Sequence, residues 1–224
     1  MAAVSAPIRT AIAIDLRYLR LKRALDVLLT VLLLVPLSVV MLAVAVAIAL
    51  DSPGNVFFRQ RRLGADGKPF EMLKFRSMYV NCGDALHRAA IERFMAGQQL
   101  SDDQPGAQFK LRDDPRVTSV GRFIRKTSLD ELPQLLNVLR GEMSLVGPRP
   151  PLPYEVERYS PRDRLRLAGK PGLTGPWQVY GRSRVTFPEM VEMDIRYLQR
   201  QSLTEDLKLI ALTLPVVLHG SGGA

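Results

Sequence analysis

Apolar residues dominate one stretch near the start of the chain, Val27 to Leu50, which contains no charged residue. As one straight helix, its 24 residues would measure about 36 Å, enough to cross a bilayer core of roughly 30 Å. Basic residues flank it on both sides: Arg17, Arg20, Lys22 and Arg23 precede it, and Arg59, Arg61, Arg62 and Lys68 follow it. A spanning helix carries more Lys and Arg on one side than on the other. We therefore expect both flanks on the same, cytoplasmic side.

Pro36 lies inside this run and predicts a break in the helix. Proline removes one backbone hydrogen bond and can bend a helix sharply, and Ser38 can help to satisfy a freed carbonyl. Two arms of about 10 to 14 residues would each cover roughly 15–20 Å, which is one leaflet. The pattern favours a re-entrant helix that leaves by the face it entered. A plain spanning anchor is the alternative.

Downstream, the pattern predicts an α+β domain. Two short strands, Val56–Gln60 and Phe70–Phe75, flank the turn dipeptide Asp66-Gly67, which indicates a β-hairpin. Helical patterns run from Cys82 to about Leu100, from Leu132 to Leu139 with Gly141 as a stop, from Pro188 to Arg200, and from Ser202 to Val217. The broad apolar side of the last helix suits the membrane surface or the core. The expected divisions are a lead-in (1–21), the re-entrant helix (22–52) and a cytoplasmic catalytic domain with membrane-surface helices (53–220).

Composition narrows the choice of partner. The chain has 224 residues, enough for one domain, and a net charge of +9, which suits nucleic acid, anionic lipid or a phosphorylated substrate. The single cysteine, Cys82, cannot form an intrachain disulfide, which fits a reducing, cytoplasmic setting. The sequence holds no Gly-Lys-Ser/Thr phosphate loop and no zinc-ligand spacing, so P-loop and zinc chemistry are excluded.

Two adjacent carboxylates, Asp130 and Glu131, open the Leu132–Leu139 helical pattern. A helix start favours anions through its free N–H groups and its dipole, so Asp130 is expected to stay ionised. It could then attack a phosphorus atom or hold a divalent cation. The same residues fit a capping box, Ser128-x-x-Glu131, which is the commoner explanation for this stretch taken alone.

Two further stretches indicate phosphate binding. Pro148 and Pro150 restrict the backbone around Arg149, so its guanidinium loses little entropy on gripping a phosphate. A solvated arginine in a proline-rich loop is the alternative. The Gly-rich stretch 171–183 contains Trp177 and Arg182, and its N–H groups can approach phosphates. Trp177 suits stacking on a nucleobase or anchoring at the membrane interface.

Five blocks in a fixed order carry a family resemblance. They are Lys22-Arg23-Ala24-Leu25-Asp26, Lys74-Phe75-Arg76-Ser77-Met78, Thr127-Ser128-Leu129-Asp130-Glu131-Leu132-Pro133-Gln134, Met143-Ser144-Leu145-Val146-Gly147-Pro148-Arg149-Pro150, and Pro171-Gly172-Leu173-Thr174-Gly175 through Gly181-Arg182-Ser183. With them the chain resembles the bacterial monotopic phosphoglycosyl transferases, also called the bacterial sugar transferase family, from about Lys22 to Gly220.

The resemblance implies a re-entrant helix that breaks at Pro36, a Mg²⁺ requirement and a reaction. A sugar 1-phosphate passes from a UDP-sugar to undecaprenyl phosphate, with release of UMP, through a covalent aspartyl-phosphosugar intermediate. It implies that Asp130 is the nucleophile, that Glu131 with Asp130 holds Mg²⁺, and that Arg149 binds phosphate. Lys74, Arg76, Arg112, Arg125 and Arg182 are further candidate phosphate ligands, with lipid headgroups as their alternative partners.

The resemblance also implies UDP-sugar, undecaprenyl phosphate and membrane lipids as partners, without nucleic acid, at the cytoplasmic face of the bacterial inner membrane. A homo-oligomer stays open. The compact form with its 82–108 insertion favours galactose or glucose over N-acetylated sugars. The chain departs from the family's Ser-Pro at Val35-Pro36 and carries an unusual Pro176. Asp194 is expected to pair with a cation. Two other hypotheses are a one-step transfer in which the carboxylates only bind metal, and a non-catalytic basic membrane protein.

Overall fold

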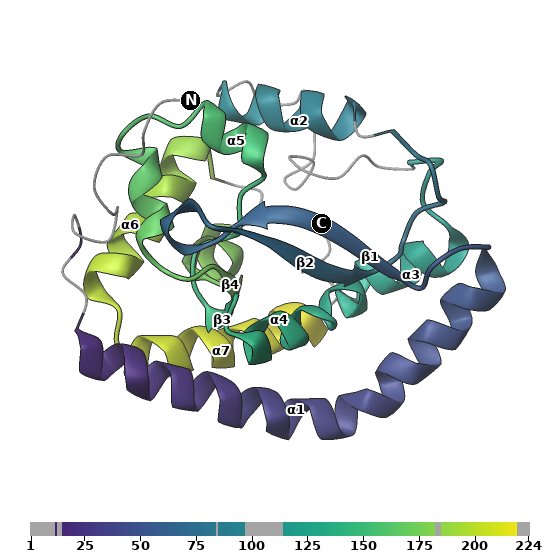
Figure 1. The fold of residues 1–224 in the computed structure, drawn as a ribbon, viewed down its shortest axis with the longest axis horizontal. Helices are drawn as coiled ribbons and strands as arrows, with labels where there is room; N and C mark the ends of the chain where they lie inside the picture. Colours follow the sequence, from purple (N-terminus) through teal and green to yellow (C-terminus); the bar gives the residue numbers. More distant parts are fainter. Residues whose placement is uncertain (1–11, 13–14, 84, 97–113, 182–184, 219–224) are drawn as a thin grey trace.

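We describe a computed structural model of the chain, covering residues 12, 15–83, 85–96, 114–181 and 185–218. The helices are α1 (Leu16–Asp51), α2 (Ala85–Met95), α3 (Ser119–Lys126), α4 (Gln134–Arg140), α5 (Pro153–Glu157), α6 (Phe187–Arg200) and α7 (Leu203–Leu218). The strands are β1 (Phe57–Leu63), β2 (Pro69–Phe75), β3 (Ser144–Val146) and β4 (Gly172–Thr174). In Figure 1 the β1–β2 hairpin runs between α2 and α4, and α1 extends along the edge of the molecule. The α+β class is therefore confirmed.

The hairpin confirms the prediction from Asp66-Gly67. β1 and β2 are antiparallel, with Phe57 opposite Phe75 and Leu63 opposite Pro69. Both turn residues take positive φ angles, 56° for Asp66 and 72° for Gly67, a conformation that Gly and Asp tolerate best. The second sheet, β3 with β4, is parallel and pairs Ser144 with Gly172 and Val146 with Thr174.

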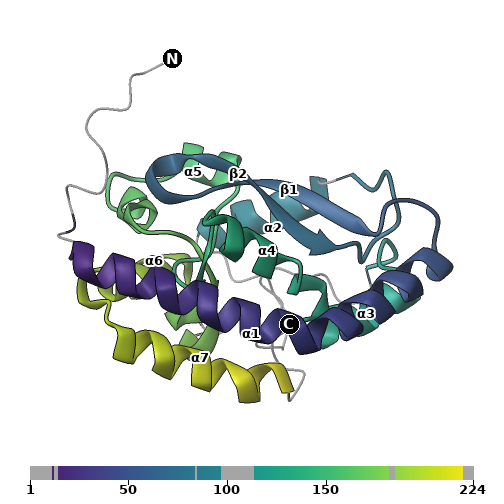
Figure 2. The same ribbon diagram turned by 60° about the horizontal axis from the view of Figure 1, so that its bottom comes forward.

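Helix α1 begins earlier than predicted. The sequence pattern placed its start at Lys22, but the helix starts at Leu16 because Asp15 caps it, accepting a hydrogen bond from the Arg17 N–H at 2.8 Å. It then continues through Pro36 to Asp51 as one helix. Figures 1 and 2 show it bent into two arms, not folded into a tight hairpin. Ser38 donates to the Val35 carbonyl at 2.7 Å beside the bend, so this turn of the helix keeps a polar partner.

One side of α1 is apolar and uncovered. Leu32 is 67% exposed, Val39 72% and Leu50 83%. Among the described residues, α1 is the one helix long and apolar enough to cross a membrane, with a mean hydropathy of 3.0 over its most apolar window. A continuous exposed apolar face of this kind marks a surface that meets lipid or another protein.

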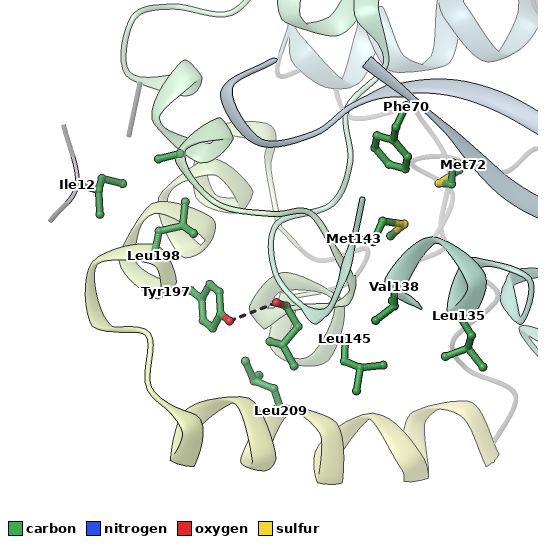
Figure 3. Packing of buried hydrophobic residues seen from close by; sticks show 12 residues of the cluster. Ile12, Phe70, Met72, Leu135, Val138, Met143, Leu145, Tyr197, Leu198 and Leu209 are labelled. Carbon is green, nitrogen blue, oxygen red and sulfur yellow. Dashed lines mark hydrogen bonds between the residues drawn. The ribbon is translucent and has the colours of Figure 1, made fainter. Parts of the chain in front are cut away.

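The largest core cluster lies between the sheets and the C-terminal helices (Figure 3). Most of its buried members come from both sheets, from α4, α6 and α7 and from Met143 just before β3; they include Phe70, Met72, Leu135, Val138, Leu145, Tyr197, Leu198 and Leu209. The Tyr197 hydroxyl donates to the Val146 carbonyl at 3.3 Å, which ties α6 to β3. A smaller cluster packs Val44 and Ile48 of α1 against Phe75 and Ile124.

Three local predictions are corrected. Ser128 adopts a left-handed conformation (φ 58°) and makes no capping bond, so the capping box is wrong. Trp177 is 9% exposed and packs in a core cluster with Phe187 and Ile195, so it is neither a surface stacking platform nor an interfacial anchor. Described helix in the 82–100 region is limited to α2.

The C-terminal helices match their predictions more closely. α6 spans Phe187–Arg200, and α7 is capped by Ser202, whose hydroxyl accepts from the Glu205 N–H at 3.2 Å. α7 buries Leu209 against the core but leaves Leu214 59% exposed. Figure 2 shows α7 running alongside the first arm of α1, so α7 faces both the core and the outside.

Candidate active site

The carboxylate pair lies in a 3₁₀ turn that links α3 to α4. The turn spans Leu129–Glu131, and the Glu131 N–H closes it on the Ser128 carbonyl at 3.1 Å. α4 follows after Pro133 and ends at Gly141, whose positive φ of 79° makes it the predicted helix stop. The pair therefore precedes the helix by a full turn instead of occupying its first turn.

The two carboxylates have different surroundings. Asp130 is 6% exposed, whereas the Glu131 side chain keeps 38% of its surface accessible. The ammonium of Lys74, on β2, lies 2.8 Å from Glu131 Oε1. The pair thus presents one shielded carboxylate and one that is open to solvent and held by a cation.

Arg125 brings a second positive charge to this turn from the last turn of α3. Burial lowers the pKa of the Arg125 guanidinium, and the negative charges of Asp130 and Asp114 oppose that shift. Arg125 and Asp130 therefore interact electrostatically in a partly desolvated setting, where such attraction is stronger than in water.

Arg149 lies in a network of buried charges behind the hairpin. Its Nη1 is 3.1 Å from Glu155 Oε2, and the Glu155 side chain is 3% exposed. Arg62 of β1 donates to the Pro150 carbonyl at 2.9 Å. Burial raises the pKa of Glu155, but Arg149, Arg62 and Arg166 outweigh it, so the pKa lies below the usual range. Glu155 is therefore ionised at neutral pH and fixes the Arg149 side chain.

A second buried pair, Arg166 with Asp194, adjoins this network, and Arg166 donates to the Arg149 carbonyl at 3.5 Å. The two residues form a pair at 2.5 Å with both side chains 0% exposed, and Arg166 also donates to the Tyr159 hydroxyl at 2.9 Å. The predicted charge pairing of Asp194 is confirmed. Its role is structural, because the pair lies wholly inside the protein.

The helix α2 contributes His87, which the sequence did not assign. Its pKa is lowered to about 4, first by burial and then by the positive charges of Arg149 and Arg62. Glu155 opposes the shift and Lys74 adds to it. His87 thus lies in a region where it interacts with Arg149, Arg62 and Lys74, two of which already pair with the carboxylates of Glu155 and Glu131. Such a region suits the phosphates of a nucleotide or lipid.

The remaining predicted ligands lie elsewhere. Arg76 is 6% exposed and its guanidinium donates to the Ser52 hydroxyl at 2.9 Å, the Ser52 carbonyl at 2.8 Å and the Asn55 carbonyl at 2.7 Å. The structure therefore uses Arg76 to hold the end of α1, not to face the carboxylate pair. Arg112 and Arg182 lie outside the described residues.

Asp130 and Glu131 could hold Mg²⁺ only together with oxygen atoms from the substrate and water. Among the described ranges, no three His, Cys, Asp or Glu side chains converge. Mg²⁺ is commonly held by one or two carboxylates together with substrate phosphates and water. Asp130 and Glu131 fit that pattern, since one carboxylate is accessible and the other adjoins it in the same turn.

Sequence comparison decides the family. The family model described as bacterial sugar transferase matches residues 17–220. The chain belongs to the bacterial sugar transferases. The match covers the apolar helix α1, the carboxylate turn and the Arg149 network together, and it confirms the resemblance carried by the five sequence blocks.

Three relatives indicate the range of the family. The exopolysaccharide production protein ExoY of Sinorhizobium fredii is 42% identical over 201 residues, 90% of this chain and 87% of that protein. The undecaprenyl-phosphate galactose phosphotransferase of Salmonella typhimurium is 41% identical over 202 residues, 90% of this chain and 41% of that protein. The galactosyl transferase CpsE of Streptococcus agalactiae is 46% identical over 170 residues, 75% of this chain. The matched part of the chain spans 36% of CpsE, so that relative is much longer.

Proposed function

We propose that this bacterial sugar transferase moves a sugar 1-phosphate from a UDP-sugar to undecaprenyl phosphate and releases UMP. The observation that carries the proposal is the pair of unlike carboxylates. Asp130 is buried beside Arg125, and Glu131 is open and held by Lys74. Relatives named as undecaprenyl-phosphate galactose phosphotransferase and UDP-glucose:undecaprenyl-phosphate glucose-1-phosphate transferase support the substrates.

In the first step, a carboxylate oxygen of Asp130 attacks the sugar-bearing phosphorus of the donor. The bond from that phosphorus to the UMP oxygen breaks, and UMP leaves with the electron pair. Asp130 then carries an acyl phosphate linked to the sugar. Its 6% exposure supports this role, because exclusion of water protects an acyl phosphate from hydrolysis.

In the second step, a phosphate oxygen of the lipid attacks the same phosphorus. The bond to Asp130 breaks, the carboxylate is regenerated, and the sugar leaves on a polyprenyl diphosphate. Lys74, Arg125 and Arg149 offset the charge of the phosphates as they approach one another. Mg²⁺ held by Glu131 and Asp130 would supply further positive charge at the donor diphosphate.

The path of α1 in the membrane is part of the proposal. Arg23 near its start contacts α4, and Asp51 at its end accepts from the Val120 N–H of α3 at 3.1 Å. Both ends contact the same catalytic domain, which is the arrangement expected if they lie on the same side of the bilayer. This supports a re-entrant helix at the cytoplasmic face of the inner membrane. Single cysteines replacing Arg20 and Asn55 in a Cys82→Ser background should both resist a membrane-impermeant thiol reagent until cells are permeabilised.

The decisive experiment is the intact mass of detergent-purified protein incubated with Mg²⁺ and UDP-glucose or UDP-galactose, without lipid acceptor. A hexose-phosphate adduct is expected on the wild type and on Asp66→Asn, a control in the hairpin turn, but not on Asp130→Asn. UMP release that begins only on adding undecaprenyl phosphate, with no adduct, would instead favour one-step transfer. The adduct mass shows a hexose, and the donor that forms it identifies which.

A further inference from the structure

The first of the five sequence blocks, Lys22 to Asp26, has no part in the chemistry described above. Two of its charged side chains are buried in the protein and do not face lipid headgroups. Lys22 is 8% exposed and Asp26 is 5% exposed. Lys22 donates to the buried carboxylate of Asp206 in α7 at 2.9 Å, and Asp26 accepts from the Leu145 N–H of β3 at 3.1 Å. This block therefore docks α1 onto the catalytic domain.

Arg23 contacts α4, the helix that follows the carboxylate turn. Its Nη1 lies 2.5 Å from the Val138 carbonyl and its Nη2 2.7 Å from the Leu139 carbonyl, both in the last turn of α4. The last carbonyls of a helix form the negative end of its dipole and lack the N–H groups of a following turn, although the Val138 carbonyl also accepts from the Gly141 N–H at 3.0 Å. A planar guanidinium can satisfy two of them at once, which a lysine ammonium on a single stem cannot match.

Gly141 ends α4 directly beside this contact. A Cβ atom there would lie 3.6 Å from Arg23 Nη2 and 3.5 Å from the ammonium of Lys170. Two cations thus converge on the C-terminal end of α4. The other end of the same helix follows the turn that carries Asp130 and Glu131. One helix of 7 residues therefore connects the membrane segment to the carboxylate pair.

We infer that Arg23 is a positioning residue for the lipid acceptor: its two hydrogen bonds to α4 fix the depth of the carboxylate pair relative to the membrane helix. The inference rests on the proposed function. The UDP-sugar arrives from water and does not depend on that depth, whereas the phosphate of a membrane-embedded lipid does. Loss of the Arg23 contacts should therefore weaken use of the lipid and leave use of the donor nearly unchanged.

The alternative role for Arg23 is to supply positive charge that orients the helix in the membrane. Arg23→Lys separates the two roles, because it keeps the charge and loses the two-carbonyl geometry. Arg20→Lys is the matched control, since Arg20 is exposed on the same helix. Full-length proteins are reconstituted in vesicles of phosphatidylethanolamine and phosphatidylglycerol with undecaprenyl phosphate.

With whichever of UDP-glucose and UDP-galactose gives turnover, Arg23→Lys is expected to raise the KM for undecaprenyl phosphate about tenfold, a change of about 1.4 kcal/mol. The KM for the donor should change less than about twofold, a shift of ~0.4 kcal/mol. Wild-type behaviour of Arg23→Lys on both substrates would overturn the inference in favour of the charge role. Equal impairment on both substrates would also overturn it, as a general structural effect.

Hydrogen–deuterium exchange provides a readout that needs no turnover. Amides 138–142 should exchange about tenfold faster in Arg23→Lys than in wild type or Arg20→Lys, since the end of α4 loses its clamp. Unchanged exchange would contradict the contact between Arg23 and the end of α4. If the wild type shows no turnover with any UDP-sugar, the proposed function fails while exchange still tests the contact. Arg23→Gln, which retains one amide donor, serves if Arg23→Lys fails to fold and should show the same faster exchange.

Discussion

Lys74 Nζ and Glu131 Oε1 lie 2.8 Å apart although 57 positions separate them in the chain. Asn137 explains how they meet. Its side chain is fully buried, accepts from the Leu73 N–H at 2.9 Å and donates to the Glu71 carbonyl at 2.7 Å. These bonds fix α4 against β2 immediately before Lys74, so the lysine reaches the turn in front of α4.

Replacing Lys74 with Gln should lower kcat about tenfold or more, because one fixed positive charge leaves the phosphate site. The Mg²⁺ concentration for half-maximal activity should fall, since the ammonium no longer competes with the cation for Glu131. The pair is partly exposed, so the fold should lose less than about 1 kcal/mol. A Mg²⁺ titration measures this, with Lys68→Gln in the exposed hairpin turn as the control. A higher Mg²⁺ requirement in Lys74→Gln would contradict the assignment.

Asp194→Asn should destabilise the protein by about 3–5 kcal/mol, because it leaves the fully buried guanidinium of Arg166 without its counter-charge. For a chain of this size that corresponds to a Tm lower by roughly 10 °C. Glu192→Gln on the same helix removes only surface pairs and should leave the Tm within about 2 °C. Similar Tm values for the two variants in a thermal melt would refute the structural role of the buried pair.

The contribution of His87 to stability should fall as the pH drops from 6.5 toward 4, while Asp194, whose pKa is raised to about 6 by burial, acts in the opposite direction in the wild type and in the His87 variant alike. His87 has its pKa lowered to about 4 in the folded protein, by burial and by Arg149 and Arg62, so the unfolded chain binds the proton first. The stabilisation from neutral His87 is fully present above pH 6.5. Glu155 does not add to this loss near pH 6, because Arg149, Arg62 and Arg166 hold its pKa below the usual range.

His87→Gln should remove that part of the pH dependence. The Tm of the variant and of the wild type, measured at pH 7.5, 6.0 and 5.0, should therefore converge or cross as the pH falls. A constant difference in Tm across the three values would show that His87 does not titrate as described.

Gly147→Ala should cost about 1–3 kcal/mol through overpacking. A Cβ atom at Gly147 would lie 2.3 Å from the Lys170 carbonyl oxygen and 2.9 Å from the Gly172 nitrogen, so the chain after β3 must move away from β4. Because Arg149 is two positions further on, kcat/KM should fall as well. Gly83→Ala is the control, since its Cβ would meet no atom within 4 Å. Equal denaturant midpoints for the two variants would count against this close packing.

Much of this architecture follows from local sequence patterns. The β-hairpin, the stop at Gly141 and the helix from Phe187 to Arg200 each depend on turn residues or helical periodicity close in sequence. The family blocks located the carboxylate turn and Arg149. Sequence reasoning placed the start of α1 too late because a single cap, Asp15, extends the helix beyond the apolar run.

The charge partners were not predictable in the same way. Arg76 and Arg149 look alike in sequence, each being a basic residue in a family block. The structure directs Arg76 to the carbonyls at the end of α1 and Arg149 to Glu155. His87 and Glu155 gave no local signal either, because their surroundings are built by segments distant in the chain. Such pairings depend on tertiary packing and not on spacing.

The docking of α1 has a practical consequence for protein production. Arg23, Lys22 and Asp26 supply hydrogen-bond partners for the Val138 and Leu139 carbonyls, the Asp206 carboxylate and the Leu145 N–H. Truncation before Pro53 would deprive all four groups of these partners. The fragment would lack part of its fold and would expose the apolar residues that α1 covers, such as Phe75 and Ile124. Detergent or nanodisc preparations of the whole chain are therefore the proper starting material.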